Sequence, residues 1–497
     1  MATKAKVFGY LPNDTPPVGQ MILLGFQHVL TMFPATVLCA LLMGFPVNTV
    51  LLVTGVGTIV ALMGSKLSMG KFIPLYYGSS FSYIAAVTAI TKPQFGVPSD
   101  PHLLSVVQAG FLATGVLNVL VGLLIRVAGG KKALDIVLPP SITGPVACSI
   151  GIGLGANALG NATGATIFVN PSAANGITNG LVNVTNGAGM SATGIVPVAI
   201  VALITLLAAV FFSTYLQDKG FLGMLPILLA AVLGFIISIP FGLVNLTVGR
   251  PTDVLGILRL PTFTFPVFND PLTLTVLFGV GVMCIATIPE STAHLYQISL
   301  YVDHLAEEQS REKYGLSQYI GLNLMLDGLD DIVNGIFGST AGTNYGENNS
   351  LMVITRNYSG PVLITAGCIA IILGFIGPLA DIVYGMPTAV YGGLSVYLFG
   401  VIGMQGIALM MSEKVNLYDP RQLAIGAIIL IIGIGGNIGF PGGFIPFQIP
   451  GFFPNGLPAI ATGAVLGILI NLVFVFFKPA SERSEKGLVE NNNPVIG

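Results

Sequence analysis

Apolar stretches of about 20 residues, separated by short turns that contain polar residues, glycine or proline, fill most of the chain. An α-helix of that length crosses the hydrocarbon core of a bilayer. We therefore predict an all-α polytopic membrane protein with fourteen membrane segments. The predicted segments are 19–42, 45–64, 74–91, 104–126, 134–155, 194–216, 222–243, 272–299, 316–337, 342–356, 360–380, 386–411, 421–439 and 456–477.

Two of these segments break the pattern. The third, 74–91, contains Gly78 within a run of tyrosines and serines, and the tenth, 342–356, crowds glycines and hydrogen-bonding residues around Glu347. Such a backbone at membrane depth has to line a cavity or be buried in protein, because lipid cannot satisfy its polar groups. A carboxylate there costs about 2.5–3.5 kcal/mol and by default indicates function. We expect the stretch Gly338–Arg356 to form half of a substrate site.

Charge is scarce along the whole chain. Charged residues make up 8% of the 497 positions, against roughly 25% in a soluble domain, so we expect no soluble domain. The net charge of −2 argues against nucleic acid as a partner. Each of the four cysteines stands alone in an apolar stretch, and we expect neither a metal site nor a cofactor.

The positions of the positive charges support the segment count. With the N-terminus inside and both irregular segments crossing, sixteen of the nineteen Lys and Arg residues fall on the cytoplasmic side. Only Lys92, Arg250 and Arg259 fall outside. The positive-inside rule predicts this asymmetry. We expect both termini in the cytoplasm and two long outside loops, 156–193 and 244–271.

The two halves of the chain repeat one another. Tyr77-Gly78 opens the polar part of the third segment, as Tyr345-Gly346 does in the tenth. Seven segments followed by seven would give halves of opposite topology, because seven is odd. Interrupted segments in matching positions of two halves indicate the binding site of a transporter.

Glu290 and His294 lie four residues apart in the eighth segment, so a helix would place them on one face. A carboxylate and an imidazole in contact can handle a proton. The alternative is a helix end that faces water, because acidic residues follow from Asp303 onward.

Other residues around the irregular segments are candidates for supporting roles. A half-helix after Glu347 would aim free backbone N–H groups at the site. His28 either supports the glutamates or is a hydrogen-bonded core histidine, and Phe81 either stacks on a flat ring or only packs. We assign no role to a second acidic cluster in the ninth segment, which consists of Asp327, Asp330 and Asp331.

These motifs resemble those of the nucleobase–ascorbate transporter family (nucleobase:cation symporter-2), and its bacterial uracil permeases in particular. The resemblance spans roughly residues 18–478. The motifs that carry it are Gln27-His28, Phe33–Leu38, Gly78–Phe81, Glu290 with His294, Asp327–Leu329, and Asn344-Tyr345-Gly346-Glu347-Asn348 with Ile354–Arg356.

The resemblance implies a seven-plus-seven inverted repeat, a core domain that moves against a gate domain, and short antiparallel strands in the third and tenth segments. It also implies a homodimer in the inner membrane. The implied parts are a cytoplasmic N-terminus (1–18), the core domain (19–126 and 272–380), the gate domain (134–243 and 386–477) and a cytoplasmic tail (478–497).

The resemblance further implies proton-coupled symport of a nucleobase, with uracil favoured and xanthine, another purine or a broader range as the alternative. A carrier for inorganic anions and an intramembrane enzyme are the competing classes, but the chain carries membrane-depth carboxylates and no catalytic motif. The implied substrate-binding residues are Glu290, Glu347, Phe81, Gly346, Ala35, Ser80 and Tyr345, and those implied for proton coupling are His294, Glu290 and His28.

Overall fold

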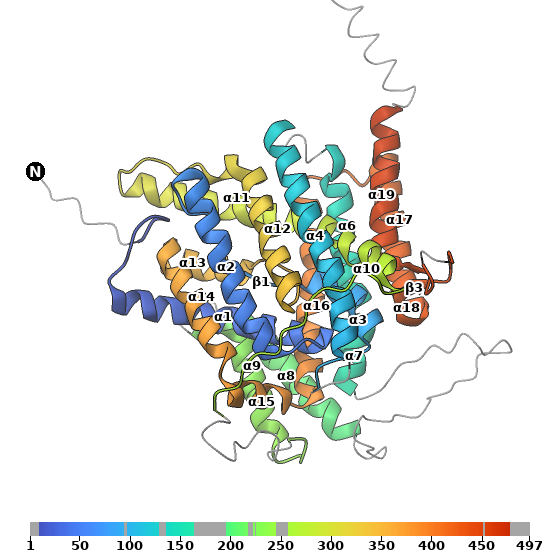
Figure 1. The fold of residues 1–497 in the computed structure, drawn as a ribbon, viewed down its shortest axis with the longest axis horizontal. Helices are drawn as coiled ribbons and strands as arrows, with labels where there is room; N and C mark the ends of the chain where they lie inside the picture. The colour runs from blue at the N-terminus through green and yellow to red at the C-terminus, as the bar shows by residue number, and fades with distance from the viewer. Residues whose placement is uncertain are drawn as a thin grey trace, which may run out of the picture.

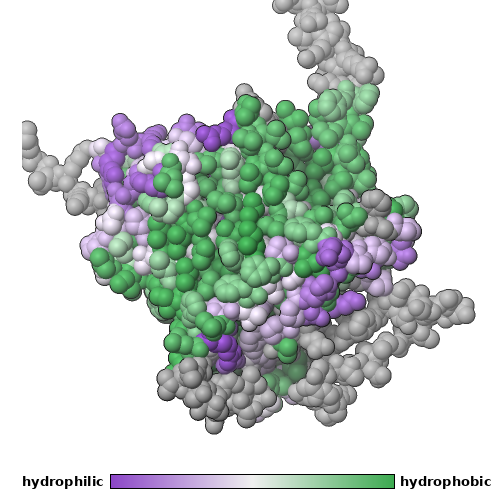
Figure 2. All heavy atoms as spheres, viewed as in Figure 1, coloured by the Kyte–Doolittle hydropathy of each residue, from purple (hydrophilic) through white to green (hydrophobic). Residues whose placement is uncertain are grey.

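The computed structural model describes residues 9–93, 97–128, 136–163, 195–216, 222–223, 225–244, 257–450 and 453–477. This part of the chain is mostly helical (Figure 1) and contains nine helices that are long and apolar enough to cross a membrane. Apolar side chains form a broad band over the face shown in Figure 2, and hydrophilic ones gather at its upper left and lower right. The chain is thus a multi-pass membrane protein, and the count of fourteen segments stays a prediction.

A first group of helices is built from the N-terminal quarter of the chain and from residues 273–374. Helix α12 packs against α4 and α2, and α14 packs against α2 and α1. The bounds are α1 Val18–Met43, α2 Val47–Met69, α3 Ile84–Thr91, α4 Pro101–Ala128, α10 Thr273–Gly279, η5 Gly281–Met283, α11 Cys284–Glu308, η6 Leu316–Tyr319, α12 Ile320–Phe337, α13 Gly346–Thr355 and α14 Gly360–Gly374.

Glycines set the distance between these helices. A Cβ atom at Gly55 of α2 would lie 2.4 Å from the carbonyl oxygen of Gly367 on α14. A Cβ atom at Gly115 of α4 would lie 2.6 Å from the carbonyl oxygen of Gly328 on α12. Membrane helices approach closely through small residues, so both interfaces depend on the absence of a side chain.

We expect Gly115→Val to destabilise the protein by about 1–3 kcal/mol, because the new side chain has to push α12 away from α4. The measurement is the thermal midpoint of the detergent-purified protein. Gly400→Val on α16 is the control, since no atom lies within 4 Å of a Cβ built there. Equal midpoints for the two variants would show that this helix contact is not tight.

A second group of helices contains the remaining segments. Helix α16 packs against α6, α7 and α8, and α17 packs against α19 and α6. In Figure 1, α17 and α19 lie on the right, whereas α13 and α14 of the first group lie on the left. The bounds are α6 Pro140–Gly153, α7 Gly155–Thr163, α8 Ile195–Tyr215, α9 Pro226–Ser238, α15 Gly377–Tyr384, α16 Thr388–Ser412, α17 Pro420–Leu430, the π-turn η7 Ile431–Gly435, α18 Gly436–Gly439, η8 Pro441–Gly443, β3 Phe444–Ile445, β4 Leu457–Pro458 and α19 Ala459–Phe476.

Several predicted boundaries differ from the observed ones. Helix α7 continues to Thr163, so the outside loop predicted at 156–193 begins as helix. The rest of that loop, the last residues of the chain from 478 and residues 1–8 lie outside the described residues. The eighth segment, predicted as one helix, divides into α10, η5 and α11. The apolar pattern continues through such a break, so it does not reveal one.

The two irregular segments meet in the middle of the first group. Strands β1 (Tyr77–Ser79) and β2 (Gly342–Asn344) pair antiparallel, with Gly78 opposite Thr343. Each strand leads into helix, β1 through the 3₁₀ turn η1 (Phe81–Tyr83) to α3, and β2 directly to α13. All six strand residues are buried. The pairing satisfies backbone groups that lipid could not.

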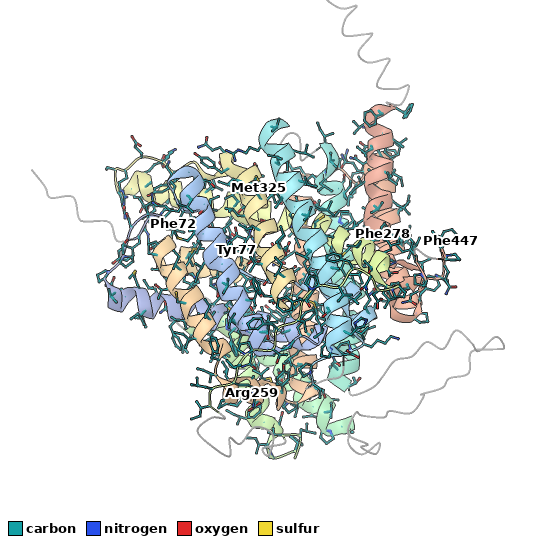
Figure 3. All side chains as sticks on the ribbon, in the orientation of Figure 1. Phe72, Tyr77, Arg259, Phe278, Met325 and Phe447 are labelled. Atoms are coloured by element: carbon teal, nitrogen blue, oxygen red, sulfur yellow. The ribbon has the colours of Figure 1, made fainter. Side chains whose placement is uncertain are left out.

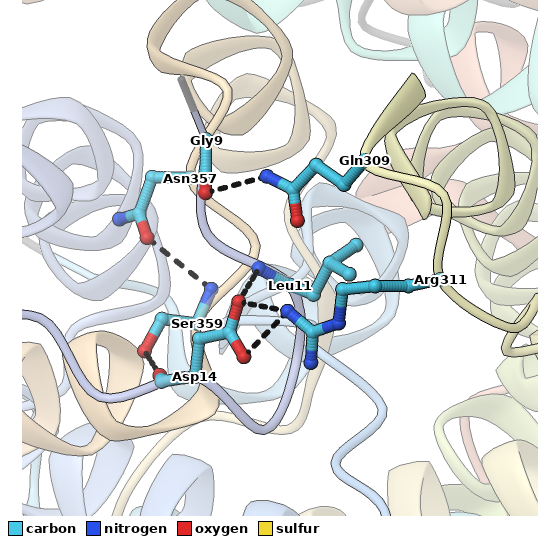
Figure 4. Close-up of polar contacts among 7 residues, drawn as sticks. All are labelled: Gly9, Leu11, Asp14, Gln309, Arg311, Asn357 and Ser359. Atoms are coloured by element: carbon cyan, nitrogen blue, oxygen red, sulfur yellow. Dashed lines mark hydrogen bonds and ion pairs between the residues drawn. The ribbon is translucent and has the colours of Figure 1, made fainter. Parts of the chain in front are cut away.

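The residues before α1 form hydrogen bonds with the α11–α12 connection and with the start of α14 (Figure 4). Gln309 donates to the Gly9 carbonyl at 2.9 Å, and Arg311 donates to the Asp14 carboxylate at 2.7 Å. The hydroxyl of Ser359 donates to the Asp14 carbonyl at 2.6 Å. Residues 9–14 therefore hold the α11–α12 connection against the start of α14.

A second extended stretch, residues 257–271, crosses the opposite ends of these helices. Arg259 forms a two-pronged ion pair with Asp381, at 2.6 and 2.9 Å. Further along, His102 lies 2.9 Å from Asp270. The backbone N–H of Leu272 and then His102 lower the pKa of Asp270. Figure 3 labels Arg259 at the lower end of the molecule, away from Tyr77 near its centre.

Candidate functional site

Strand β2 fixes the ring of His294. The Nδ1 atom lies 2.9 Å from the carbonyl oxygen of Asn344 and 2.8 Å from its side-chain oxygen. Because a carbonyl oxygen only accepts, Nδ1 carries the hydrogen and donates it. A Cβ atom at Gly346 would lie 2.8 Å from the other ring nitrogen, Nε2. In the neutral ring Nε2 is therefore a proton acceptor, and it faces the first residue of α13.

A buried network of hydrogen bonds fixes β2 against α11. The side-chain amide of Asn344 donates to the Ser291 hydroxyl at 2.6 Å, and the amide of Asn323 on α12 donates to the same hydroxyl at 2.8 Å. All three residues are fully buried. The sequence-based prediction missed Asn323 and Ser291. Both residues could have been noticed in the sequence because they are polar residues in otherwise apolar helices. Asn323 also lies one turn before Asp327.

The two candidate glutamates come from different helices, and each is close to His294. Glu290 lies one turn before it on α11, and Glu347 follows Gly346, whose Cβ position faces Nε2. Glu290 on α11 is half-buried, whereas Glu347 in the first turn of α13 is exposed. The free N–H groups at the start of α13 give this end of the helix a partial positive charge. The site therefore combines two carboxylate acceptors with backbone donors.

Glu347 faces a cavity of about 170 Å³ between the two groups of helices. Of the predicted site residues, only Glu347 is among the lining of this cavity. The volume of the cavity is below the roughly 300 Å³ or more of pockets for drug-sized ligands, so it has room for a small ring. The lining residues are Leu30, Thr31 and Pro34 of α1, Gly223 and Leu225–Leu228 at the start of α9, and Glu347, Ser350, Leu351 and Ile354 of α13.

Tyr345 is buried beneath the site. Its hydroxyl donates to the Ser79 carbonyl at 3.0 Å and lies 2.9 Å from the Thr36 hydroxyl. A Cβ atom at Gly78 would lie 2.4 Å from the Tyr345 ring. Tyr345 therefore packs α1 against β1, and its hydroxyl is already bonded within the protein.

Ala35 and Ser80 are also buried, at 7% and 3% exposure. Ser80 donates its backbone N–H to Ala341, next to β2, at 3.1 Å. Its hydroxyl accepts from the Ser82 N–H at 3.3 Å and so caps η1. In the structure these contacts hold the end of β1 beside β2.

His28 of α1 is 1% exposed. The side-chain amide of Asn348 donates to its Nδ1 and to its carbonyl oxygen, both at 3.1 Å. Within the described part of the chain, no hydrogen bond joins His28 to a glutamate, so His28 contacts the site through Asn348, the neighbour of Glu347. This arrangement favours a hydrogen-bonded histidine that positions the start of α13.

Phe81 brings the two groups of helices into contact. Its ring meets that of Phe399 on α16 edge to face, with centroids 5.9 Å apart. Phe399 was not singled out from the sequence, because an isolated phenylalanine in an apolar helix carries no signal.

Long apolar helices around paired carboxylates, a fixed histidine and a cavity define a polytopic membrane transport protein. The sequence profile described as Permease family matches residues 19–442, and the chain belongs to this family. It is therefore a transporter and not an enzyme, and the family resemblance seen in the sequence is confirmed.

Curated relatives match along nearly the whole chain. The uracil permease of Bacillus caldolyticus is 31% identical over 482 residues, which cover 97% of each chain. The uracil permease of Escherichia coli K12 is 32% identical over 467 residues, 93% of each chain.

Solved structures show the same fold at low identity. The transmembrane domain of a cyanobacterial bicarbonate transporter is 17% identical, with a TM-score of 0.52 over 93% of this chain and 98% of that one. The murine anion transporter Slc26a9 in its inward-facing state is 13% identical, with a TM-score of 0.60 over 94% of this chain and 69% of that one.

Proposed function

We propose that the chain is a proton-coupled symporter that imports a nucleobase, uracil in particular, across the cytoplasmic (inner) membrane. The observation that carries this proposal is the pair Glu290 and Glu347 beside His294, at the N-terminus of α13, in a chain whose relatives are named uracil permeases.

The chemistry of the site suits a flat neutral pyrimidine. The two carboxylates accept from ring N–H groups, backbone N–H groups near Gly346 donate to ring carbonyls, and Phe81 covers a face. Each bond left unmade in a buried site would cost about 1–3 kcal/mol. Xanthine, another purine or a broader set of bases is the alternative substrate.

Proton coupling follows from the two carboxylates. Two ionised carboxylates that share one ligand repel each other once the bound ligand shields them from water, so one of them then binds a proton more readily. A neutral ligand that accepts and donates hydrogen bonds there then binds best with that proton in place. The Nε2 atom of His294 faces the same region and accepts the proton as the site reorganises.

The first group of helices would act as the core (19–126 and 272–380) and the second as the gate (134–243 and 386–477). The contact of α2 with α14 is matched by that of α12 with α4, as a seven-plus-seven inverted repeat requires.

The two groups of helices are closed against each other at one place. Where α3 and α10 meet the β3–β4 end of the second group, the remaining void is only about 10 Å³. If the Lys and Arg residues mark the cytoplasmic side, as the positive-inside rule suggests, the Glu347 cavity opens to the cytoplasm, and this supports an inward-facing form. We propose a homodimer with both termini in the cytoplasm.

His294→Ala is expected to remove the dependence of uptake on the proton gradient while uracil binding weakens by no more than about tenfold, the equivalent of one hydrogen bond. Uptake at a series of external pH values, together with binding to the purified protein, measures both effects. His304→Ala is the control, because His304 lies on the same helix but is exposed and pairs with Glu308. An unchanged pH profile would remove His294 from coupling.

The experiment that tests the function is uptake of labelled uracil by cells that lack their own uracil permease, with and without a protonophore. Excess thymine, xanthine, uric acid and ascorbate serve as competitors. We expect uptake that collapses with the gradient and that only pyrimidines block. Uptake of xanthine in place of uracil would move the proposal to the alternative substrate.

A further inference from the structure

Two aspartates that the transport site does not use lie side by side on α12. Asp330 and Asp331 are 1% and 0% exposed. The N–H of Gly342, the first residue of β2, donates to Asp331 at 2.8 Å, and Asn118 of α4 donates to its other oxygen at 3.0 Å. The side-chain amide of Asn334 donates to Asp330 at 2.9 Å.

The second carboxylate oxygen of Asp330 occupies the space left by a missing side chain. A Cβ atom at Gly57 of α2 would lie 1.9 Å from this oxygen, Oδ1. A Cβ atom at Gly342 would lie 2.9 Å from the other oxygen, Oδ2. The carboxylate is therefore enclosed between α2 and the two-stranded sheet, with Asp327 buried one helical turn earlier.

No ion pair with a described residue balances the charge of this cluster. Across the described residues, none of the ion pairs involves an aspartate of α12. Ionised carboxylates without a partner are among the most costly groups to bury. The cluster therefore requires protons or another cation.

Several buried polar oxygens around the aspartates have no hydrogen-bond partner. Among the described residues, no hydrogen-bond partner is found for Asp330 Oδ1, for the side-chain oxygens of Asn118 and Asn334, or for the Tyr77 hydroxyl. All four residues are at most 1% exposed.

Tyr77 points toward the cluster. Alternation along the paired strands places the side chains of Tyr77 and Ser79 on the same face of the sheet as position 342. A Cβ atom at position 342 would point at Asp330, so the Tyr77 side chain lies on the face that α12 covers. The amide oxygens and this hydroxyl are not part of the carboxylates; each can offer a lone pair to a cation, and the hydroxyl can also donate its own hydrogen to a carboxylate.

We infer that Asp330 and Asp331, with Asn118, Asn334 and Tyr77, form a binding site for a monovalent cation, either a proton or an alkali-metal ion, that is exchanged during transport. Hard cations take oxygen ligands of this kind. The role in transport rests on the proposed function.

The site is linked to the candidate substrate site through β2. Asp331 holds the N–H of Gly342 at the start of the strand, and Asn344 at its end holds His294. A change in the charge of Asp331 therefore acts on the strand that positions His294. The other titratable groups near the cluster are Asp327, Tyr76, Tyr83, Cys284 and Glu290. Helix α2 contributes Gly57 and α4 contributes Asn118, both of which are neutral.

The test needs no substrate. The thermal midpoint of the detergent-purified chain is measured at pH 6 and pH 9, in sodium chloride and in choline chloride at equal ionic strength. We expect the wild type to be least stable at pH 9 in choline. A midpoint raised by about 3 °C or more by sodium identifies an alkali-metal ion, and one raised only by low pH identifies a proton.

Asp330→Asn is expected to lose most of this response, whereas Glu347→Gln, which leaves α12 untouched, should keep it. An equal response in the wild type and Asp330→Asn would overturn the inference. If Asp330→Asn does not fold, Asp331→Asn replaces it. A wild-type midpoint that is the same in all four conditions overturns the inference without any variant. Because uracil is absent, failure of this site and failure of uracil transport are separate results.

Discussion

Glu347→Gln and Glu290→Gln are each expected to abolish uracil uptake while the protein still reaches the membrane. A hydrogen bond to a charged group contributes about 1.5–3 kcal/mol, so the loss of one carboxylate acceptor lowers affinity by roughly 10- to 150-fold. The change also removes one of the two carboxylates whose repulsion favours proton binding, so the coupling of uracil uptake to the proton is lost as well.

The measurement is uptake of labelled uracil, corrected for the amount of protein in the membrane. Glu307→Gln provides the control, because Glu307 is an exposed surface carboxylate that pairs with Lys313. Near-normal uptake by either site variant would remove that carboxylate from the mechanism. Loss of uptake in the control would point to a general effect of losing one acidic residue.

Gly78→Val is expected to abolish transport by disrupting the fold beneath the site. The new Cβ would lie 2.4 Å from the Tyr345 ring, and that ring is held by the Thr36 hydroxyl and the Ser79 carbonyl. Overpacking of a close contact costs about 1–3 kcal/mol, and occasionally more. Both the thermal midpoint and uracil uptake should fall.

A paired variant tests whether the Tyr345 ring is the cause. Gly78→Ala alone should destabilise the protein, and Gly78→Ala combined with Tyr345→Ala should lose less than the two single changes added together. Gly155→Ala is the control, since no atom lies within 4 Å of a Cβ at that position. Additive losses would show that the two residues are not in conflict.

Much of the architecture follows from local sequence. Only long apolar helices cross the hydrocarbon core of a bilayer in a chain of this kind, so their positions could be predicted from hydropathy. The polar segments around Gly78 and Glu347 could be identified because their composition does not suit a lipid-facing helix. The family resemblance assigned His294 and Gly346 to one site without predicting that they meet, and the structure places Nε2 of the ring against that glycine.

Other features depend on contacts between distant residues and could not be predicted. Phe399 meets Phe81 only because α16 packs beside η1, and Asn323 reaches Ser291 only because α12 lies beside α11. The connection from Asp14 to Arg311 joins residues that are 297 positions apart. No periodicity or short motif carries such information. The roles of the site residues remain predictions that the variants test.

The most direct test of the central claim is uracil counterflow by the purified chain in liposomes. Liposomes loaded with unlabelled uracil are diluted into a trace of labelled uracil, so that any exchange has to pass through this one protein. We predict transient accumulation of label that excess thymine reduces and ascorbate does not, and that Glu347→Gln abolishes. No accumulation with uracil, alongside clear exchange of xanthine in the same liposomes, would contradict the assignment of uracil as the substrate.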